Sequence, residues 1–387
     1  MAAASFRHGT RAQQEMEVGD TRRKLPPQLG RSPRCLQSAI ELWAGDEFSL
    51  GSRVTESWFP TAAHLFAEAV AQAELHERAA AAARTRFGNR AFVRAVVEVS
   101  NFCRENCRYC GMRRDNRDLG RFRARHDELA ELLVHRRQAS ITDVNLQSGE
   151  DPVGVREVVL PLVRTLRRET KLGVSVCLGT LDAKLTRELQ EAGATTYIIK
   201  FELADPELYE KLEAPGTLTE RTAYIRSLVA GGWQVSSGFI AGLPEQDAES
   251  VLQNFRLAAA LPLSGCSVSP FVPGDETPLA AAASADLELT LNCMASLRLM
   301  RPDWVIPAVS ALNLAGPGSG YRRGLATGAN LVTINLTPDA VRGDYLLYKR
   351  DRFIMTEERI LAAISAEGLV PSTTSLADHL AARVVTI

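Results

Sequence analysis

The chain has 387 residues, of which 45% are hydrophobic and 24% charged, the composition of an ordinary globular protein. The formal net charge of −1 gives no reason to expect a nucleic-acid or membrane-surface partner. No apolar run approaches the ~18 residues of a transmembrane helix, and no signal peptide is visible. Most of the seven cysteines are scattered, which predicts a reducing, cytoplasmic setting and no disulfide framework.

The N-terminal region is expected to contain a tail and a helical segment. Residues 1–35 hold seven basic and three acidic residues with little apolar periodicity, which predicts a disordered tail. A transit peptide is the alternative, but such peptides are poor in acidic residues. Residues 36–90 form the predicted helical segment, because the alanine-rich run Thr61–Arg86 has helical spacing and stops near Gly88.

From residue 91 onward, eight strand-like runs alternate with helical runs over about 245 residues, as in a TIM-type (β/α)8 barrel. We place this barrel at residues 91–338 and a C-terminal closing segment at 339–387. A doubly wound open sheet is the competing architecture, but eight such units favour closure. The predicted strands are Phe92–Val99, Asp143–Gln147, Gly173–Leu178, Thr195–Glu202, Gln234–Ala241, Cys266–Val272, Trp304–Val309 and Asn330–Asn335. The predicted helices are Asp127–Gln138, Val155–Lys171, Asp182–Ala192, Glu220–Ala230, Ala248–Ala260, Leu287–Met300, Tyr321–Thr327 and Thr356–Gly368.

Cysteines cluster at one place, directly after the first predicted strand, as Cys103, Cys107 and Cys110. Three thiolates at the spacing C-x3-C-x2-C can bind three irons of a 4Fe–4S cluster. A closed electron-transfer cluster would need a fourth cysteine, and none is nearby, so one iron stays open for a substrate or cofactor. A structural zinc site is the alternative, but zinc prefers two pairs of ligands, and the nearest histidine, His126, is remote.

The same spacing is the signature of the radical S-adenosylmethionine (SAM) enzymes. In those enzymes the open iron chelates the amino and carboxylate groups of SAM, and one electron from the cluster releases a 5′-deoxyadenosyl radical. Barrel enzymes carry their chemistry at the carboxyl ends of the strands, where this cysteine loop lies. No single side chain is assigned as catalytic, because the cluster and SAM generate the radical.

Candidate SAM contacts follow other predicted strands. Gln147, Ser148, Gly149 and Glu150 end the second strand, and the glycine would let backbone carbonyls approach the SAM ammonium group. Ile240 lies in the glycine-rich end of the fifth strand and could pack on the adenine.

Four further positions have a functional and a structural interpretation. Tyr109, beside the last cysteine, could contact the adenine or only pack in the loop. Lys200 and Glu202 lie on one face of the fourth predicted strand, so Glu202 could bind the SAM ribose or amine, or pair with Lys200. Arg221 could hold the SAM carboxylate or be a solvent-exposed helix arginine. The remaining cysteines are expected to pack as small apolar side chains: Cys35, Cys177, Cys266 and Cys293.

Residues 97–116, with the cysteine loop at their centre, resemble the FeFe-hydrogenase maturase HydE family within the biotin synthase-like group of radical SAM enzymes. The similarity extends over roughly residues 60–350. It includes residues 146–152, and the sequence of this segment favours this family. The resemblance implies a complete (β/α)8 barrel with a 4Fe–4S cluster and SAM on its upper rim. It assigns SAM binding to the matches of Gln147–Glu150, Glu202 and Arg221.

The resemblance also implies a substrate, a cysteine-bound iron–carbonyl–cyanide fragment, with Ser175 and Lys200 facing the internal cavity. The chain departs from the family at Lys200 and Phe201, where arginine and histidine are usual, and lysine is not equivalent at a bidentate site. No cysteine follows Cys293, so we expect no second cluster near the C-terminus.

The expected partners are therefore a small-molecule or metal-complex substrate and a reducing electron donor. A methylornithine-synthase-like mutase, or another biosynthetic radical SAM enzyme, is the first alternative. The second is a non-catalytic iron–sulfur electron-transfer protein, which would need a fourth cluster ligand. The sequence does not name the substrate, the electron donor or the oligomeric state.

Overall fold

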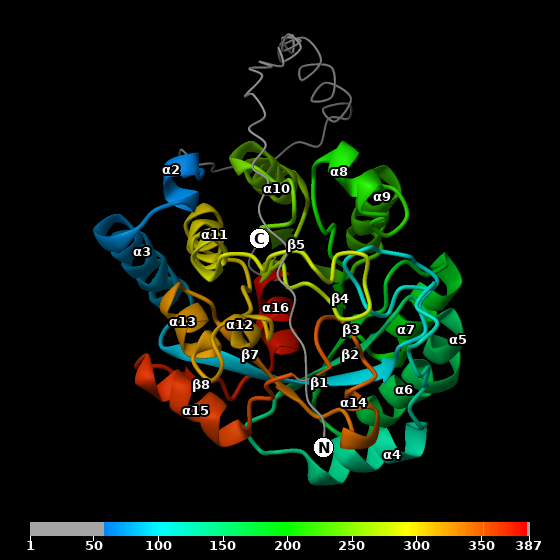
Figure 1. Cartoon of the computed structure of the whole chain (residues 1–387). Coiled ribbons are helices and arrows are strands. Elements are labelled where there is room, and N and C mark those ends of the chain that lie inside the picture. The colour runs from blue at the N-terminus through cyan, green and yellow to red at the C-terminus, as the bar shows by residue number, and fades with distance from the viewer. Residues whose placement is uncertain (1–57, 351, 385–387) are drawn as a thin grey trace, which may run out of the picture. The chain divides into compact units, whose positions relative to one another are not determined.

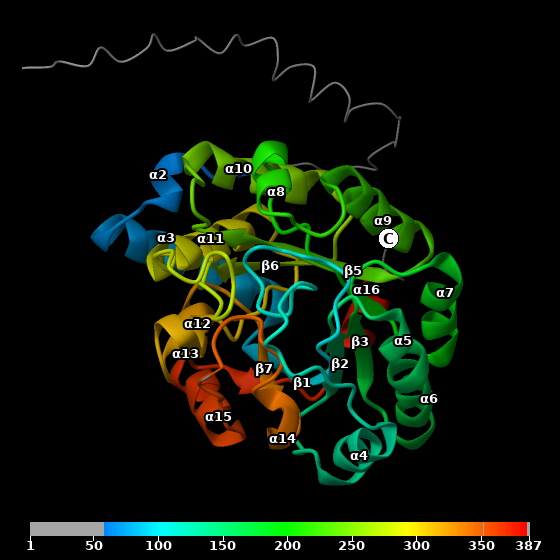
Figure 2. The same cartoon turned by 45° about the vertical axis from the view of Figure 1, so that its right-hand side comes forward.

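The computed structural model describes residues 58–350 and 352–384. The tail predicted at residues 1–35 and the first part of the helical segment predicted at 36–90 lie outside these residues. The described residues belong to one compact unit, in which strands surround a central space and helices lie outside them (Figures 1 and 2). The finer domain boundaries near residues 90 and 338 stay predictions. None of the helices in the described part could cross a membrane.

Seven strands follow one another around this ring in the order β6-β5-β4-β3-β2-β1-β7. Every neighbouring pair is parallel, as expected for a barrel in which a helix connects successive strands. The strands are β1 (Arg90–Ser100), β2 (Asp143–Ser148), β3 (Gly173–Cys177), β4 (Thr196–Ile198), β5 (Gln234–Ala241), β6 (Gly265–Pro270) and β7 (Leu331–Asn335).

A segment between β6 and β7 closes the ring. Val305 forms a parallel bridge with Gly265 of β6, and Pro307 forms one with Leu331 of β7. The eighth strand predicted at Trp304–Val309 is therefore right in place, but it consists of isolated bridges. Proline has no N–H for a regular ladder, which explains the irregular pairing. The fold is the predicted parallel (β/α)8 arrangement.

β1 shows how the sequence supplies both the core and the cavity. All but its first residue are buried, as in parallel strands that are covered on both faces. Val93 and Val97 belong to the hydrophobic core, whereas Arg94 and Glu98 line the central cavity. The alternation of side chains along a strand therefore places polar groups inside the barrel.

The helices match the predicted positions with local differences. The helix predicted at Thr61–Arg86 is two helices, α2 (Ala62–Leu65) and α3 (Ala69–Phe87), while the predictions at Ala248–Ala260 and Leu287–Met300 coincide with α10 and α11. The other elements, with η for π-helical turns, are α4 (His126–Glu131), η1 (Leu132–Arg136), α5 (Pro152–Gly154), η2 (Val155–Val159), α6 (Leu160–Glu169), α7 (Ala183–Ala192), α8 (Pro206–Lys211), α9 (Leu218–Ala230), α12 (Leu312–Ala315), α13 (Gly320–Ala326), α14 (Asp339–Arg342) and α15 (Glu357–Ala366).

Within the closing segment predicted at 339–387, a strand and a helix lie at the amino-terminal end of the barrel, a position that the sequence analysis did not specify. The short strand β8 (Val370–Pro371) pairs with the start of β1, and α16 (Leu376–Val384) follows it. Leu376 and Leu380 of α16 pack in a cluster with residues of β1 and β7 and also line the cavity. In Figure 2, α16 lies behind the ring of strands.

Candidate functional site

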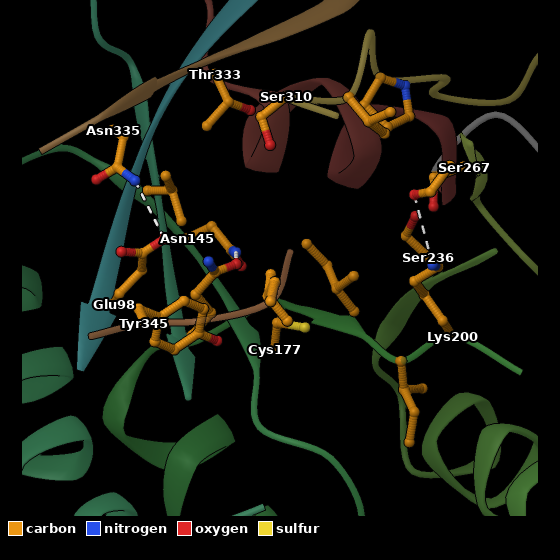
Figure 3. A pocket seen from close by; sticks show the side chains of 18 of the residues that line it. Glu98, Asn145, Cys177, Lys200, Ser236, Ser267, Ser310, Thr333, Asn335 and Tyr345 are labelled. Carbon is orange, nitrogen blue, oxygen red and sulfur yellow. Dashed lines mark hydrogen bonds between the residues drawn. The ribbon is translucent and has the colours of Figure 1, made fainter. Parts of the chain in front are cut away.

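The interior of the barrel contains a cavity of about 360 Å³ lined by all seven strands of the ring and by the cysteine loop. Every site residue predicted from the sequence lines this cavity except Ser175. Figure 3 shows side chains that enter the same space from different sides, among them Glu98, Asn145, Cys177 and Lys200. The strand ends and the loop are thus brought together as the barrel architecture predicted.

The three cysteines of the loop share one wall of this cavity. The backbone N–H of Glu150 donates a hydrogen bond to the Cys103 sulfur over 3.3 Å. Burial raises the pKa of all three thiols, that of Cys110 to about 12, so a thiolate here requires a positive partner. Iron supplies such a charge, because a coordinating thiol is deprotonated by its metal.

The donor set fits a 4Fe–4S cluster better than a single ion. Among the described residues, no three His, Cys, Asp or Glu side chains form a group that could hold one metal ion. A cubane cluster places each thiolate on a different iron, so three sulfurs spread along a wall suit it.

Arg121 fixes the cysteine loop, a role that the sequence analysis missed. Its guanidinium donates to the carbonyl oxygens of Asn101 (2.6 Å), Met112 (2.9 Å), Arg113 (2.7 Å) and Asn116 (3.2 Å). These carbonyls lie on both sides of the cysteines in sequence. The planar fork of one arginine can therefore hold the loop closed around the cluster position.

Gly149 brings the second strand against the cysteine loop. A Cβ atom at this position would lie 2.2 Å from the carbonyl oxygen of Phe102 and 2.8 Å from the Cβ of Cys103. The backbone itself donates from Gly149 to the carbonyl of Ser100 over 3.0 Å. The glycine therefore has a steric role in the packing of the loop, in addition to the ligand contact predicted for it.

Glu150 and Arg221 form a buried ion pair. The Arg221 Nη1 atom lies 2.7 Å from Glu150 Oε1, and the two side chains are only 6% and 7% exposed. Burial acts to lower the pKa of Arg221, but the Glu150 carboxylate, together with Tyr209 and Glu202, raises it overall. The solvent-exposed alternative for Arg221 is therefore wrong, and its guanidinium already holds a carboxylate of the chain itself.

The pairing of Lys200 with Glu202 is also present, with Nζ and Oε2 3.2 Å apart. Burial acts to lower the pKa of Lys200, but Glu202, together with Tyr348 and Cys177, raises it overall. The strand predicted to carry both residues is shorter than expected, because β4 ends at Ile198 and Glu202 has a φ of 65°. Backbone bonds to β5 hold Glu202 in this conformation, including 2.8 Å from the Ile240 N–H to its carbonyl.

The remaining SAM candidates all line the cavity, and some of their polar atoms already form hydrogen bonds within the chain. Ile240 is 7% exposed and lines the cavity at the end of β5. The Tyr109 side chain lines it too, and burial raises the pKa of its hydroxyl well above the usual value. The Gln147 Oε1 atom accepts a bond from Asn145 over 3.3 Å, and the Ser148 hydroxyl donates to the Gly149 carbonyl over 2.6 Å.

Ser175, predicted to face the cavity, lies behind its wall. Its hydroxyl lies 3.2 Å from both the Val144 carbonyl and Asn145 Oδ1, and it can donate to either. Asn145 lines the cavity instead, so Ser175 is placed to orient that amide. The functional assignment of Ser175 stays a prediction that would have to act through Asn145.

Three cavity residues were not expected. Glu98 is 1% exposed and pairs over 2.8 Å with Arg352, which comes from the C-terminal segment. Arg94 is 9% exposed, and no residue in the described part of the chain forms a hydrogen bond or ion pair with its guanidinium. Cys177, assigned to packing, lines the cavity. The alternation along β1 was the one signal that could have revealed Arg94 and Glu98.

Comparisons with known proteins agree with this arrangement. The sequence model of the radical SAM superfamily matches residues 97–258. The chain is 34% identical over 263 residues to the [FeFe] hydrogenase maturase subunit HydE of Thermotoga maritima, which covers 67% of this chain and 74% of that protein. It is 29% identical over 320 residues to 3-methylornithine synthase of Methanosarcina barkeri, which covers 81% of this chain and 90% of that protein. A crystal structure of methylornithine synthase superposes with a TM-score of 0.72 at 25% identity, over 86% of this chain and 99% of that one.

Proposed function

Because the chain belongs to the radical SAM superfamily, whose members use a 4Fe–4S cluster and SAM, we propose that it is a HydE-like enzyme of hydrogenase active-site assembly. The observation that carries this proposal is the 34% identity to HydE over 263 residues. The small substrate would bind in the enclosed barrel cavity. A separate one-electron reductant would provide the electrons that reduce the cluster.

The cysteine loop would hold the cluster through Cys103, Cys107 and Cys110. When bound, the cluster and SAM supply a 5′-deoxyadenosyl radical. Arg121 keeps the loop in shape by binding carbonyls on both sides of the cysteines. The N–H of Glu150 donates to the Cys103 sulfur, which stabilises negative charge on it.

The rim residues would bind and orient SAM. The Tyr109 and Ile240 side chains would contact its adenine, while Glu202 and the polar end of β2, Gln147–Glu150, would bind its ribose and its amino group. Arg221 is paired with Glu150, so we propose that the two act together, with Arg221 fixing the carboxylate that faces the ligand. The barrel wall excludes water from the reacting groups.

The test is anaerobic reconstitution with iron and sulfide, followed by dithionite and SAM. We expect 5′-deoxyadenosine to form. Cys107→Ala should abolish it, whereas Cys293→Ala should retain it, because Cys293 is buried in α11 and does not line the cavity. A verified cluster that gives no SAM cleavage would contradict the proposal.

A second candidate is a 3-methylornithine-synthase-like mutase. It is favoured by the methylornithine synthase crystal structure, of which this chain covers 99%. Expression of the chain in a strain that lacks HydE should restore active hydrogenase. Rescue of a strain that lacks 3-methylornithine synthase, and not of the first strain, would select the second candidate.

A further inference from the structure

We propose that Cys177 is the hydrogen-atom donor of the barrel, a thiol that quenches the carbon radical formed on the substrate. This proposal rests on the radical SAM function above. Cys177 is the last residue of β3 and lines the cavity that the three loop cysteines also line. Cys266 and Cys293 are buried elsewhere in the barrel and do not line it. Within the described residues, Cys177 is thus the one cavity thiol that the cluster does not require.

The charges around Cys177 place it between the cofactor residues and the rest of the cavity. Its thiol lies within electrostatic range of Glu202 and Arg221, which are predicted SAM contacts, and of Lys200, which is predicted to face the substrate cavity. It is also within range of Arg94 on β1. In Figure 3 the sulfur of Cys177 points into the open space between the side chains that surround it.

Arg94 is independent evidence that a ligand binds beside this thiol. Its guanidinium lines the cavity and is 91% buried, since the residue is 9% exposed. Its Nε atom has no hydrogen-bond partner, and no described residue forms an ion pair with it. The Asp143 carboxylate lies within electrostatic range of Arg94 but forms no ion pair or hydrogen bond with it. A buried guanidinium with unused donors is unfavourable, so a polar or anionic group of a bound molecule is expected to complete it. That molecule would lie within reach of Cys177.

The cavity keeps the thiol in the form that can give up a hydrogen atom. Burial raises the pKa of Cys177 to about 11, so the sulfur carries its hydrogen at neutral pH. An S–H bond is weaker than an aliphatic C–H bond, and so are the phenolic O–H bonds of the cavity tyrosines Tyr109, Tyr321, Tyr345 and Tyr348, whereas aliphatic O–H and N–H bonds are stronger. Thiols give a hydrogen atom to carbon radicals faster than phenols do, so a carbon radical beside Cys177 would take hydrogen from the thiol first.

The step balances with one named co-reactant. A C–H bond forms on the carbon radical as the S–H bond of Cys177 breaks homolytically, which leaves a thiyl radical. The thiyl radical takes one electron from the one-electron reductant that also serves the cluster, and one proton from water. The thiol is then restored for the next turnover.

The experiment uses the full chain with its cluster, SAM and dithionite in D₂O, without added thiols or substrate, so that the adenosyl radical takes the place of the substrate radical as the carbon radical that Cys177 quenches. The Cys177 thiol exchanges to S–D, so the 5′-deoxyadenosine formed should carry one deuterium, measured by mass spectrometry. Cys177→Ser should lose this label, because a hydroxyl does not release its hydrogen to a carbon radical. Cys266→Ala is the matched control and should retain the label. The same deuterated fraction in Cys177→Ser would overturn the proposal, whereas the absence of any 5′-deoxyadenosine would instead contradict the radical SAM function.

A second measurement does not depend on turnover or on the folding of a variant. Iodoacetamide applied to the cluster-loaded chain at about pH 9.5, where part of the Cys177 thiol is ionised, should alkylate Cys177, which is partly exposed to the cavity, and should leave the buried Cys293 unmodified. SAM should slow the reaction at Cys177 by filling the entrance. A Cys177 thiol that resists alkylation as Cys293 does would show that it is not reachable from the cavity and would overturn the proposal.

Discussion

Gly149 carries a steric requirement that can be tested by adding one methyl group. The Cβ of Gly149→Ala would lie 2.2 Å from the backbone oxygen of Phe102, so the cysteine loop or the end of β2 must move. We expect the variant to bind less iron and to lose about 1–3 kcal/mol in the free energy of unfolding, as overpacked sites do. Iron per chain after reconstitution and the unfolding midpoint measure the two effects.

Gly343→Ala is the control for this substitution. A Cβ at Gly343 meets nothing within 4 Å, and its φ of −66° suits any residue. Iron binding and stability should therefore be unchanged. If both glycine variants bind iron equally well, close packing at Gly149 does not shape the loop.

Because the pair of Arg221 and Glu150 is buried, we expect that removing one partner lowers the free energy of unfolding more than breaking an exposed pair does. Arg221→Gln would leave the Glu150 carboxylate with only the half-exposed Arg104 as a partner, 3.1 Å away. Breaking a buried pair by removing one partner costs about 3–5 kcal/mol. We expect that loss in urea unfolding, together with weaker SAM binding, measured as a smaller SAM-induced change in the cluster EPR signal.

An exposed arginine gives the comparison. Arg256 pairs with Glu249 on α10, and both side chains are about half exposed. Arg256→Gln should cost less than about 1 kcal/mol, because water screens such pairs. Equal losses in the two arginine variants would mean that burial of the Glu150 pair adds nothing.

The residues that the sequence revealed are those fixed by spacing or by strand ends. The cysteine spacing located Cys103, and the position after β2 located Glu150, because parallel strands deliver their carboxyl ends to one rim. Cys177 was missed because most free cysteines are buried packing, although it lies on the same face of β3 as Ser175. Ser175 does not line the cavity because Asn145, to which it bonds, lines it instead, and the sequence does not show that contact.

At the scale of elements, β4 shows where sequence patterning stops. The apolar and polar alternation of Thr195–Glu202 predicted a long strand, yet the strand ends at Ile198. Glu202 adopts a φ of 65°, a conformation that β patterning does not encode and that neighbouring β5 enforces. Lys200 and Glu202 lie beyond the regular strand and still line the cavity.

The packing of α3 on α11 predicts a pH dependence. His76 of α3 lies 2.8 Å from Asn292 Oδ1 of α11, with Glu288 and Arg323 as the nearby charges. Burial is the main cause that lowers the pKa of His76 below 6.5. A lowered histidine pKa gives stability that is complete above the unfolded value and is lost as pH falls through the folded value. The unfolding midpoint should therefore decrease as pH is lowered from about 6.5.

His76→Gln isolates the contribution of His76 to the pH dependence of the unfolding midpoint. Glutamine can still donate to Asn292 but does not titrate, so the decrease in the unfolding midpoint below about pH 6.5 should be shallower than in the unchanged chain. The midpoint of each protein is followed by circular dichroism across the same buffers. Parallel curves for the two proteins would assign the pH dependence to other groups.

At the scale of the molecule, eight alternating units were enough to predict the barrel, because each strand–helix pair repeats the same signal. The position of β8 and α16 at its amino-terminal end was not predictable. α16 is only nine residues long, and its contribution to the cavity wall consists of Leu376 and Leu380. Two apolar residues in a short segment carry no periodic signal, so their role appears only when β8 brings them beneath β1.

Closure of the barrel depends on Arg298 of α11, which is fully buried. Its guanidinium donates to the carbonyls of Gly328 (2.8 Å), Pro302 (2.9 Å) and Trp304 (2.7 Å) and to Asn330 Oδ1 (3.0 Å). These acceptors flank the bridging segment and the start of β7. One side chain thus ties together both partners of the final closure.

Arg298→Met should loosen that closure. It leaves several buried acceptors without donors, and we expect a loss of at least about 3 kcal/mol in the free energy of unfolding. The amide of Val305, which donates to Ser264, and that of Cys266, which donates to Val305, should exchange with solvent hydrogen faster than in the unchanged chain. Arg256→Met is the control, because Arg256 is about half exposed and pairs with Glu249 on α10, outside the closing segment. If exchange at Val305 is the same in both variants, the ring is held closed by strand pairing and side-chain packing without help from Arg298.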